Sequence, residues 1–175
     1  IDIRVRLSID KFEALRAELK RSPFILGVTA SSHELGTFDN EVQHEFKVKS
    51  DREVLTLRPG KMNIDYEFLD VYGIKLKEGR NFSKDMATDR GRAFIINESF
   101  AKELGLEEPV GMPAGPGWFH DDSLGTIIGV VKDFNFKSLH HEIYPLEMEW
   151  HPSWGFSQGE MSVKFDGTRT EEAIA

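Results

Sequence analysis

The 175-residue chain contains no cysteine, so it has neither a disulfide nor a thiolate nucleophile or metal ligand. It also contains no run of 18 apolar residues, which excludes a membrane-spanning helix within these residues. Lys and Arg number 22 against 30 Asp and Glu, which gives a formal net charge of −8. Nucleic-acid binding requires a basic face. We therefore expect no nucleic-acid partner.

Catalytic motifs are lacking as well. The sequence has no GxSxG nucleophile elbow, and its Gly/Pro-rich residues 111–117 lack the GK[ST] ending of a phosphate-binding loop. We expect no catalytic residue, no cofactor and no structural metal. One alternative stays open, a metal-dependent hydrolase that would use His120 with Asp122 and His140 with His141, although their spacing matches no helical HExxH pattern.

What the chain does have is the composition of a globular protein. Hydrophobic residues make up 39% and charged residues 30%, and 13 Phe and 3 Trp supply large side chains for a core. Alternating apolar residues predict a strand over residues 1–7, and apolar residues at helical spacing predict a helix over 10–21. A second strand is expected over 24–30, so the chain opens with a β-α-β unit.

Further strands are expected over residues 42–49, 54–62, 74–77, 93–96, 126–131, 146–150 and 161–165. Asp65 and Asn97 are expected to cap two helices that end at Gly73 and Gly105, and residues 109–117 are expected to form a loop. Hairpin-like pairs interrupt the alternation of strands and helices, which predicts an α+β fold with a mixed sheet.

The composition changes at residue 81, which predicts a second, smaller α/β lobe over residues 81–157, inserted into a first lobe made of residues 1–80 and 158–175. The sequence starts at Ile1, and a helix expected from Thr170 is still unfinished at Ala175. We therefore expect a segment of a longer polypeptide.

Five aromatic residues gather in Gly/Pro/Ser-rich surroundings: Trp118, Phe119, Trp150, Trp154 and Phe156. Tryptophan is enriched at interfaces, so Trp118, Phe119, Trp154 and Phe156 are candidate contacts for a partner or ligand. A secreted carbohydrate- or peptide-binding module that uses Trp118, Trp150 and Trp154 is the second alternative function. Ordinary core and loop packing would explain the same residues without any ligand.

Three stretches of the sequence resemble one known family. Residues 63–83 (NIDYEFLDVYGIKLKEGRNFS) are similar to a signature of the MacB-like periplasmic core domain of FtsX-like ABC-transporter permeases. Residues 128–139 (IGVVKDFNFKSL), followed by IYPL at 143–146, resemble a second segment of that domain. Residues 95–105, which contain NES and LG, fit a third piece between them.

The resemblance implies a fold, a location and partners. The first lobe would be the porter-like lobe with a truncated C-terminal helix, and residues 81–157 would be the Sabre-like lobe. The domain would stand on the periplasmic side of the bacterial cytoplasmic membrane, between membrane helices of a multi-pass permease dimer. It would couple ATP hydrolysis on a separate cytoplasmic ATPase to efflux or mechanotransmission, with a periplasmic adaptor as a further partner, and it would not itself be an enzyme. Alone, it is expected to be monomeric.

Overall fold

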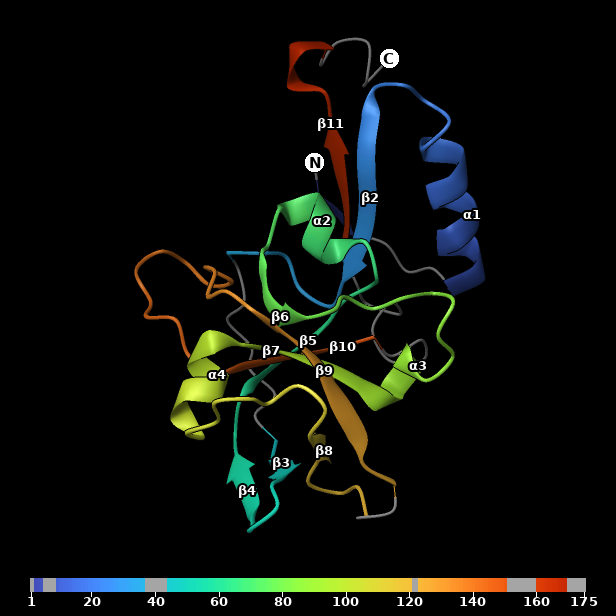
Figure 1. The fold of residues 1–175 in the computed structure, drawn as a ribbon. Coiled ribbons are helices and arrows are strands. Elements are labelled where there is room, and N and C mark those ends of the chain that lie inside the picture. Colours follow the sequence, from blue (N-terminus) through green and yellow to red (C-terminus); the bar gives the residue numbers. More distant parts are fainter. Residues whose placement is uncertain (1, 5–8, 37–43, 121–122, 151–159, 170–175) are drawn as a thin grey trace.

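The computed structural model describes residues 2–4, 9–36, 44–120, 123–150 and 160–169, and it folds them into two β-sheets (Figure 1). The smaller sheet has the strand order β1-β11-β2, with β1 at Asp2–Arg4, β2 at Ile25–Ser31 and β11 at Glu160–Phe165. Both pairings are antiparallel, so β1 and β2 run parallel on either side of β11. The expected β-α-β unit is therefore present, with the last strand of the chain inserted between its two strands.

The larger sheet has eight strands, and most of them come from the middle of the chain. Its order is β4-β3-β8-β9-β7-β10-β5, and β6 pairs with β9 beside this path. The pairs β7–β9 and β10–β5 are parallel, while the others are antiparallel. The strands are β3 (Phe46–Lys49), β4 (Val54–Leu57), β5 (Gly60–Asn63), β6 (Leu76–Gly79), β7 (Ala93–Asn97), β8 (Pro113–Pro116), β9 (Gly125–Val131) and β10 (Leu146–Glu149). This arrangement confirms the predicted α+β class with a mixed sheet.

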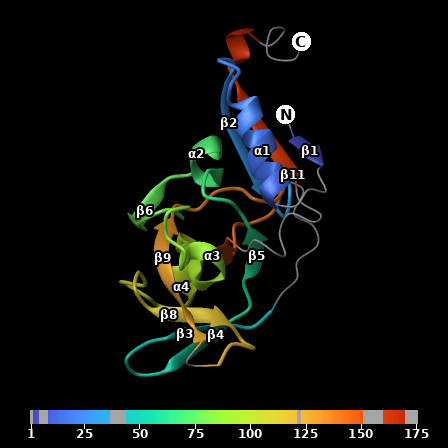
Figure 2. The same ribbon diagram turned by 90° about the vertical axis from the view of Figure 1, so that its right-hand side faces the viewer.

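Helix α1 (Ile9–Leu19) covers one face of the smaller sheet, as Figure 2 shows. Phe12 is buried against Val28, Ala30 and Met161, with Leu15 and Leu19 beside them. Positions 12, 15 and 19 share one side of a helix, because 3.6 residues make a turn. The predicted helix over 10–21 is thus confirmed to within two residues.

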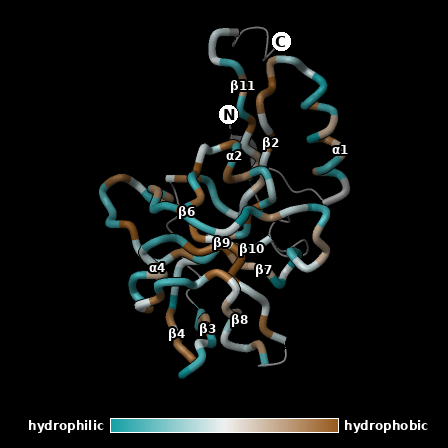
Figure 3. Tube along the Cα trace, viewed as in Figure 1, coloured by the Kyte–Doolittle hydropathy of each residue, from teal (hydrophilic) through white to brown (hydrophobic). Residues whose placement is uncertain are grey.

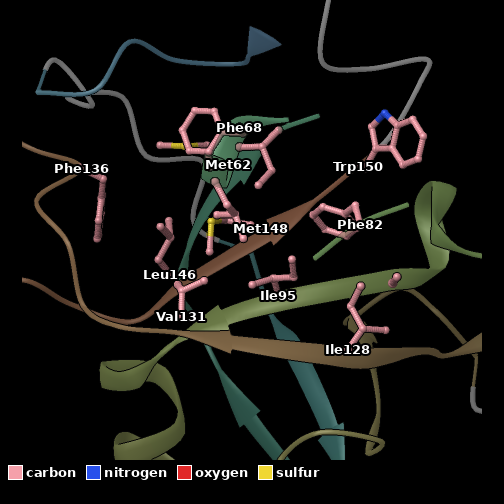
Figure 4. Packing of buried hydrophobic residues seen from close by; sticks show 13 residues of the cluster. Met62, Phe68, Phe82, Ile95, Ile128, Val131, Phe136, Leu146, Met148 and Trp150 are labelled. Carbon is pink, nitrogen blue, oxygen red and sulfur yellow. The ribbon is translucent and has the colours of Figure 1, made fainter. Parts of the chain in front are cut away.

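The larger sheet is buried on both faces. Phe94 and Ile96 of β7 join a cluster with Phe46 and Phe100, whereas Ile95 joins the cluster on the opposite face. In Figure 4 the side chains of this second cluster point toward one another across β5, β7, β9 and β10. The hydrophobic segments in Figure 3 accordingly concentrate in the central strands. Helices α2 (Phe68–Tyr72) and α4 (Glu98–Glu103) cover opposite faces, and α3 (Asp89–Arg92) precedes β7.

Two of the predicted elements differ from the structure. Residues 109–117 were expected to be a loop, but β8 at Pro113–Pro116 pairs with both β3 and β9. Its prolines stand at the two ends of the strand, where a missing N–H costs least. Residues 54–62 were expected to form a strand interrupted near Pro59 and Gly60, but they form two strands, β4 and β5, at opposite ends of the strand order in the larger sheet. Arg58 and Pro59 separate the two strands.

The sheets do not follow the predicted boundary at residue 80. Strands β3 to β6 lie within residues 46–79, before the predicted boundary. They nevertheless belong to the larger sheet, where they pair with β8, β9 and β10 from after the boundary. As a division into domains, residues 1–80 with 158–175 against 81–157 stays a prediction. The helix expected from Thr170 lies outside the described residues.

Candidate functional site

The two sheets are joined where the end of β2 meets the end of β5. Ser31 and Ile64 form an antiparallel bridge, and three hydrogen bonds surround it. The Ser32 amide donates to the Asn63 carbonyl at 2.8 Å, the Asp65 amide donates to the Ala30 carbonyl at 3.1 Å, and the Asn63 amide donates to the Ser32 hydroxyl at 3.0 Å. The sheets are therefore connected by backbone pairing as well as by side-chain packing.

A buried ion pair lies at this joint. The guanidinium of Arg16 on α1 contacts the carboxylate of Asp65, and both side chains are almost fully buried, with 4% and 2% exposed. Asp65 also accepts hydrogen bonds from the Thr29 hydroxyl at 2.6 Å and from the amides of Ala30 and Glu67 at 3.1 and 2.9 Å. One carboxylate thus links α1, β2 and the segment that leaves β5.

This network corrects the expected role of Asp65. The residue that precedes α2 is Glu67, and its side chain makes no capping hydrogen bond. Asp65 binds the Glu67 amide just before the helix, and its other contacts are with Arg16 and the smaller sheet. Gly73, in contrast, ends α2 with φ 70° as predicted.

Aromatic rings enclose the Arg16 side chain. Its guanidinium carbon lies 4.5 Å from the centre of the Phe12 ring and 4.6 Å from that of Tyr66. Burial raises the pKa of Asp65 to about 6, an effect that Arg16 and the three hydrogen bonds oppose. Burial also raises the pKa of Tyr66 to about 12. At neutral pH the pair is therefore ionised and sealed from solvent.

A second charged pair fixes the segment after β6. Arg80 donates two hydrogen bonds to Asp89, at 2.6 and 2.8 Å, and the Ser83 amide donates to the same carboxylate at 2.8 Å. Asp89 is buried, and Phe82 between them is buried in the core. Arg80, in the Gly-Arg-Asn-Phe motif at residues 79–82, therefore fixes the 80–89 connection through two parallel hydrogen bonds to one carboxylate.

Two further motifs meet at the ends of the parallel strands β7 and β9. The Asn97 side chain accepts hydrogen bonds from the amides of Phe100 and Leu146, at 3.0 and 2.9 Å, and donates to the Tyr144 carbonyl at 3.0 Å. Beside it, Ser99 donates from its amide and its hydroxyl to the Asp133 carboxylate. The NES and KDF segments thus hold each other, and Asn97 caps α4 as predicted.

Replacing Asn97 by alanine should lower the free energy of unfolding by about 2–3 kcal/mol, because it removes a helix cap and leaves buried backbone groups unpaired. Urea unfolding measures the loss. Asn135→Ala is the control, since Asn135 is exposed in the neighbouring motif and its replacement should change stability by less than about 0.5 kcal/mol. Equal losses in both variants would contradict the role assigned to Asn97.

The structure separates the predicted aromatic contacts. Trp118 is 61% exposed, and Phe119 is half-buried against Gly115. Trp150 is 1% exposed and packs in the core against Tyr66, so a binding groove that includes it is ruled out. Trp154 and Phe156 lie outside the described residues.

The two His clusters lie far apart. His120 precedes β9, whereas His140 and His141 follow it, and seven residues of extended strand span about 20 Å. All three histidines are exposed, and Asp122 lies outside the described residues. Within the part of the chain that the structure describes, no group of three or more His, Asp or Glu side chains is placed to hold a metal ion.

Sequence reasoning missed the charged residues that the fold buries. Arg16 stands 49 positions before Asp65, and no local pattern connects the two. Glu147 and Glu149 on β10 are also buried, although the strand that carries them was predicted. A sequence signal of burial existed for Arg16 only, because Arg16 lies between Phe12 and Leu19 on the apolar face of α1.

The first and last described strands are antiparallel neighbours in the smaller sheet. Asp2 pairs with Ser162 and Arg4 with Glu160, so the start of β1 and the end of β11 point toward the same end of the sheet. The opposite end of the sheet, at Ser31, adjoins the larger sheet (Figure 1). None of the described helices is long and apolar enough to cross a bilayer.

Solved structures similar to this chain include the three domains that follow, whereas no protein-family model and no curated protein matches the sequence. The periplasmic region of MacB from Actinobacillus actinomycetemcomitans is 18% identical with a TM-score of 0.60, over 98% of this chain and 72% of that chain. A domain of a protein classed as a permease from Porphyromonas gingivalis is 17% identical with a TM-score of 0.63, over 98% and 73%. The extracellular domain of the ABC-type transporter YknZ from Gram-positive bacteria is 16% identical with a TM-score of 0.55, over 99% and 88%. The fold of this chain is therefore that of a MacB-like periplasmic domain.

Proposed function

We propose that this chain is the extracytoplasmic domain of a bacterial ABC-transporter permease, on the periplasmic side of the cytoplasmic membrane. The observation that carries the proposal is the similarity in fold, over 98% of the chain, to the periplasmic region of MacB. The pairing of β1 with β11 supports it, because a domain carried on two neighbouring membrane segments requires both connections at one end.

In this proposal the domain transmits movement and performs no chemistry. ATP is hydrolysed by a separate cytoplasmic domain or subunit, and the domain couples that hydrolysis to efflux or mechanotransmission. The smaller sheet would receive the movement at the β1 and β11 ends and pass it to the larger sheet. The buried Arg16–Asp65 pair and the backbone bonds at Ser31–Ile64 support this role, because they resist separation of the two sheets.

Partners would contact the larger sheet and the membrane segments. The permease forms a dimer in the membrane, and an adaptor protein contacts the exposed Trp118 with Phe119 beside it. The isolated domain is a monomer, since it lacks the membrane tether that holds the copies together and carries a net charge of −8.

Cysteine labelling of the full-length protein tests the location. This chain has no cysteine, and Ala87 is exposed in the turn before α3, so Ala87→Cys in an otherwise cysteine-free protein provides a single reactive site. Intact cells with a permeabilised outer membrane are treated with a membrane-impermeant maleimide, and lysed cells serve as the control. Labelling in the intact cells is the expected result, whereas labelling only after lysis would place the domain in the cytoplasm and overturn the proposal.

A further inference from the structure

A buried polar cluster lies on one face of β10. Glu147 is fully buried, and its Oε1 lies 3.3 Å from Nε2 of His44, which precedes β3. Glu149, two residues further along the same face, contacts the Lys61 ammonium of β5 at 2.5 Å. Two carboxylates, one ammonium and one imidazole therefore share a largely buried site, in which 17% of the Lys61 side chain and 8% of the His44 side chain are exposed.

His44 and Glu147 are in contact, but not in good hydrogen-bond geometry. Among the described residues, neither carboxylate oxygen of Glu147 and neither ring nitrogen of His44 has a hydrogen-bond partner. Lys61 is engaged by Glu149, so it leaves the Glu147 charge without a direct partner. An ionised carboxylate in such a site is costly, and a proton on Glu147 removes that cost.

The exposed Trp118 covers this pair. Its ring centre lies 5.0 Å from that of His44, and the Lys61 ammonium lies 6.0 Å from the Trp118 ring. The Gly117 amide donates a hydrogen bond to the Glu45 carbonyl, which ties the Trp118 segment to the His44 segment. Residues 44–45 and 117–118 thus form one corner of the larger sheet, here called the Trp118 corner.

We propose that a proton on Glu147, beside His44, holds the Trp118 corner closed over β10, and that loss of this proton opens the corner. With the proton present, Glu147 is neutral and the corner stays closed. Without it, Glu147 is a buried carboxylate, and admitting water is the less costly state. Because Trp118 is 61% exposed, opening changes the surface that this corner presents to a partner.

The sign of the pH dependence follows from the surroundings of Glu147. Burial raises its pKa above the ordinary 4.5, and Glu149 adds to that rise, while His44 and Lys61 oppose it. The neighbour from β7, Ile96, carries no charge. A carboxyl group with a raised pKa in the folded state favours the closed corner at low pH and loses that contribution as the pH rises through this value.

Nuclear magnetic resonance of the 175-residue chain tests the proposal. The indole N–H signal of Trp118, identified by its absence in Trp118→Phe, and the amide signal of Glu45 should shift together as the pH rises, with a common midpoint above 4.5. In Glu147→Gln, an isosteric change that removes the titrating carboxyl, neither signal should shift. Glu142→Gln, at an exposed glutamate, should behave like the unchanged protein.

Two results would overturn the proposal: signals that do not shift between acidic and alkaline pH in the unchanged protein, or signals that still shift in Glu147→Gln. A melting curve shows whether Glu147→Gln is folded. If it is not, His44→Gln provides the second test: His44 opposes the rise in the pKa of Glu147, so its replacement should move the common midpoint to higher pH. An unchanged midpoint in folded His44→Gln counts equally against the proposal.

Discussion

Replacing Asp65 by alanine is expected to lower the free energy of unfolding by about 3–5 kcal/mol at neutral pH, because it leaves a buried charge without its partner. Arg16 would stay in a site where 4% of its side chain is exposed. The Thr29 hydroxyl and the amides of Ala30 and Glu67 would lose their acceptor as well. Chemical unfolding followed by circular dichroism measures the loss.

The pair Arg21–Glu18 provides the control for this experiment. The Arg21 guanidinium lies 2.9 Å from the Glu18 carboxylate at the end of α1, the helix that carries Arg16, but 77% and 70% of the two side chains are exposed. Glu18→Ala should therefore change stability by less than about 0.5 kcal/mol, as for most surface ion pairs. A loss below about 1 kcal/mol in Asp65→Ala would mean that Arg16 finds water or another partner, and that the buried pair contributes little to the stability of the joint.

Replacing Gly79 by alanine is expected to cost about 3 kcal/mol or more, since strain and overlap act together. Gly79 has φ 74°, which an L-residue adopts only with strain. A Cβ there would overlap the carbonyl oxygen of Ile128 and lie 2.7 Å from the Cα of Gly129. Both obstacles are backbone atoms of the central strand β9, which cannot rotate away as a side chain can.

Gly73→Ala separates the strain from the overlap. Gly73 has a nearly equal φ of 70°, and among the described residues no atom beyond its own helix and chain neighbours lies within 4 Å of the position that a Cβ would take. The control should therefore lose only about 1 kcal/mol, which is the cost of the left-handed conformation. Thermal or urea unfolding of the two variants gives the difference directly. Equal losses would show that β9 shifts easily at Gly129, contrary to its place in the middle of the sheet.

The sequence by itself determined the elements whose signals are local. The spacing of Phe12, Leu15 and Leu19 predicted α1, and Asn97 and Gly73 marked a helix start and a helix end, because these signals depend on neighbours within one or two turns. The ordered MacB-like motifs at 63–83 and 128–139 led to the fold that the solved structures confirm.

Only the tertiary structure decided which strands are neighbours and which charges are buried. β8 exists because β3 and β9 lie on either side of it, and no pattern within residues 109–117 indicates those partners. Asp65 looked like a helix cap until the fold brought Arg16 to it from 49 residues away, and Glu147 gained its raised pKa only through burial in the larger sheet. Strand pairing and desolvation depend on contacts between distant parts of the chain, whereas helix periodicity and capping are set within a few residues.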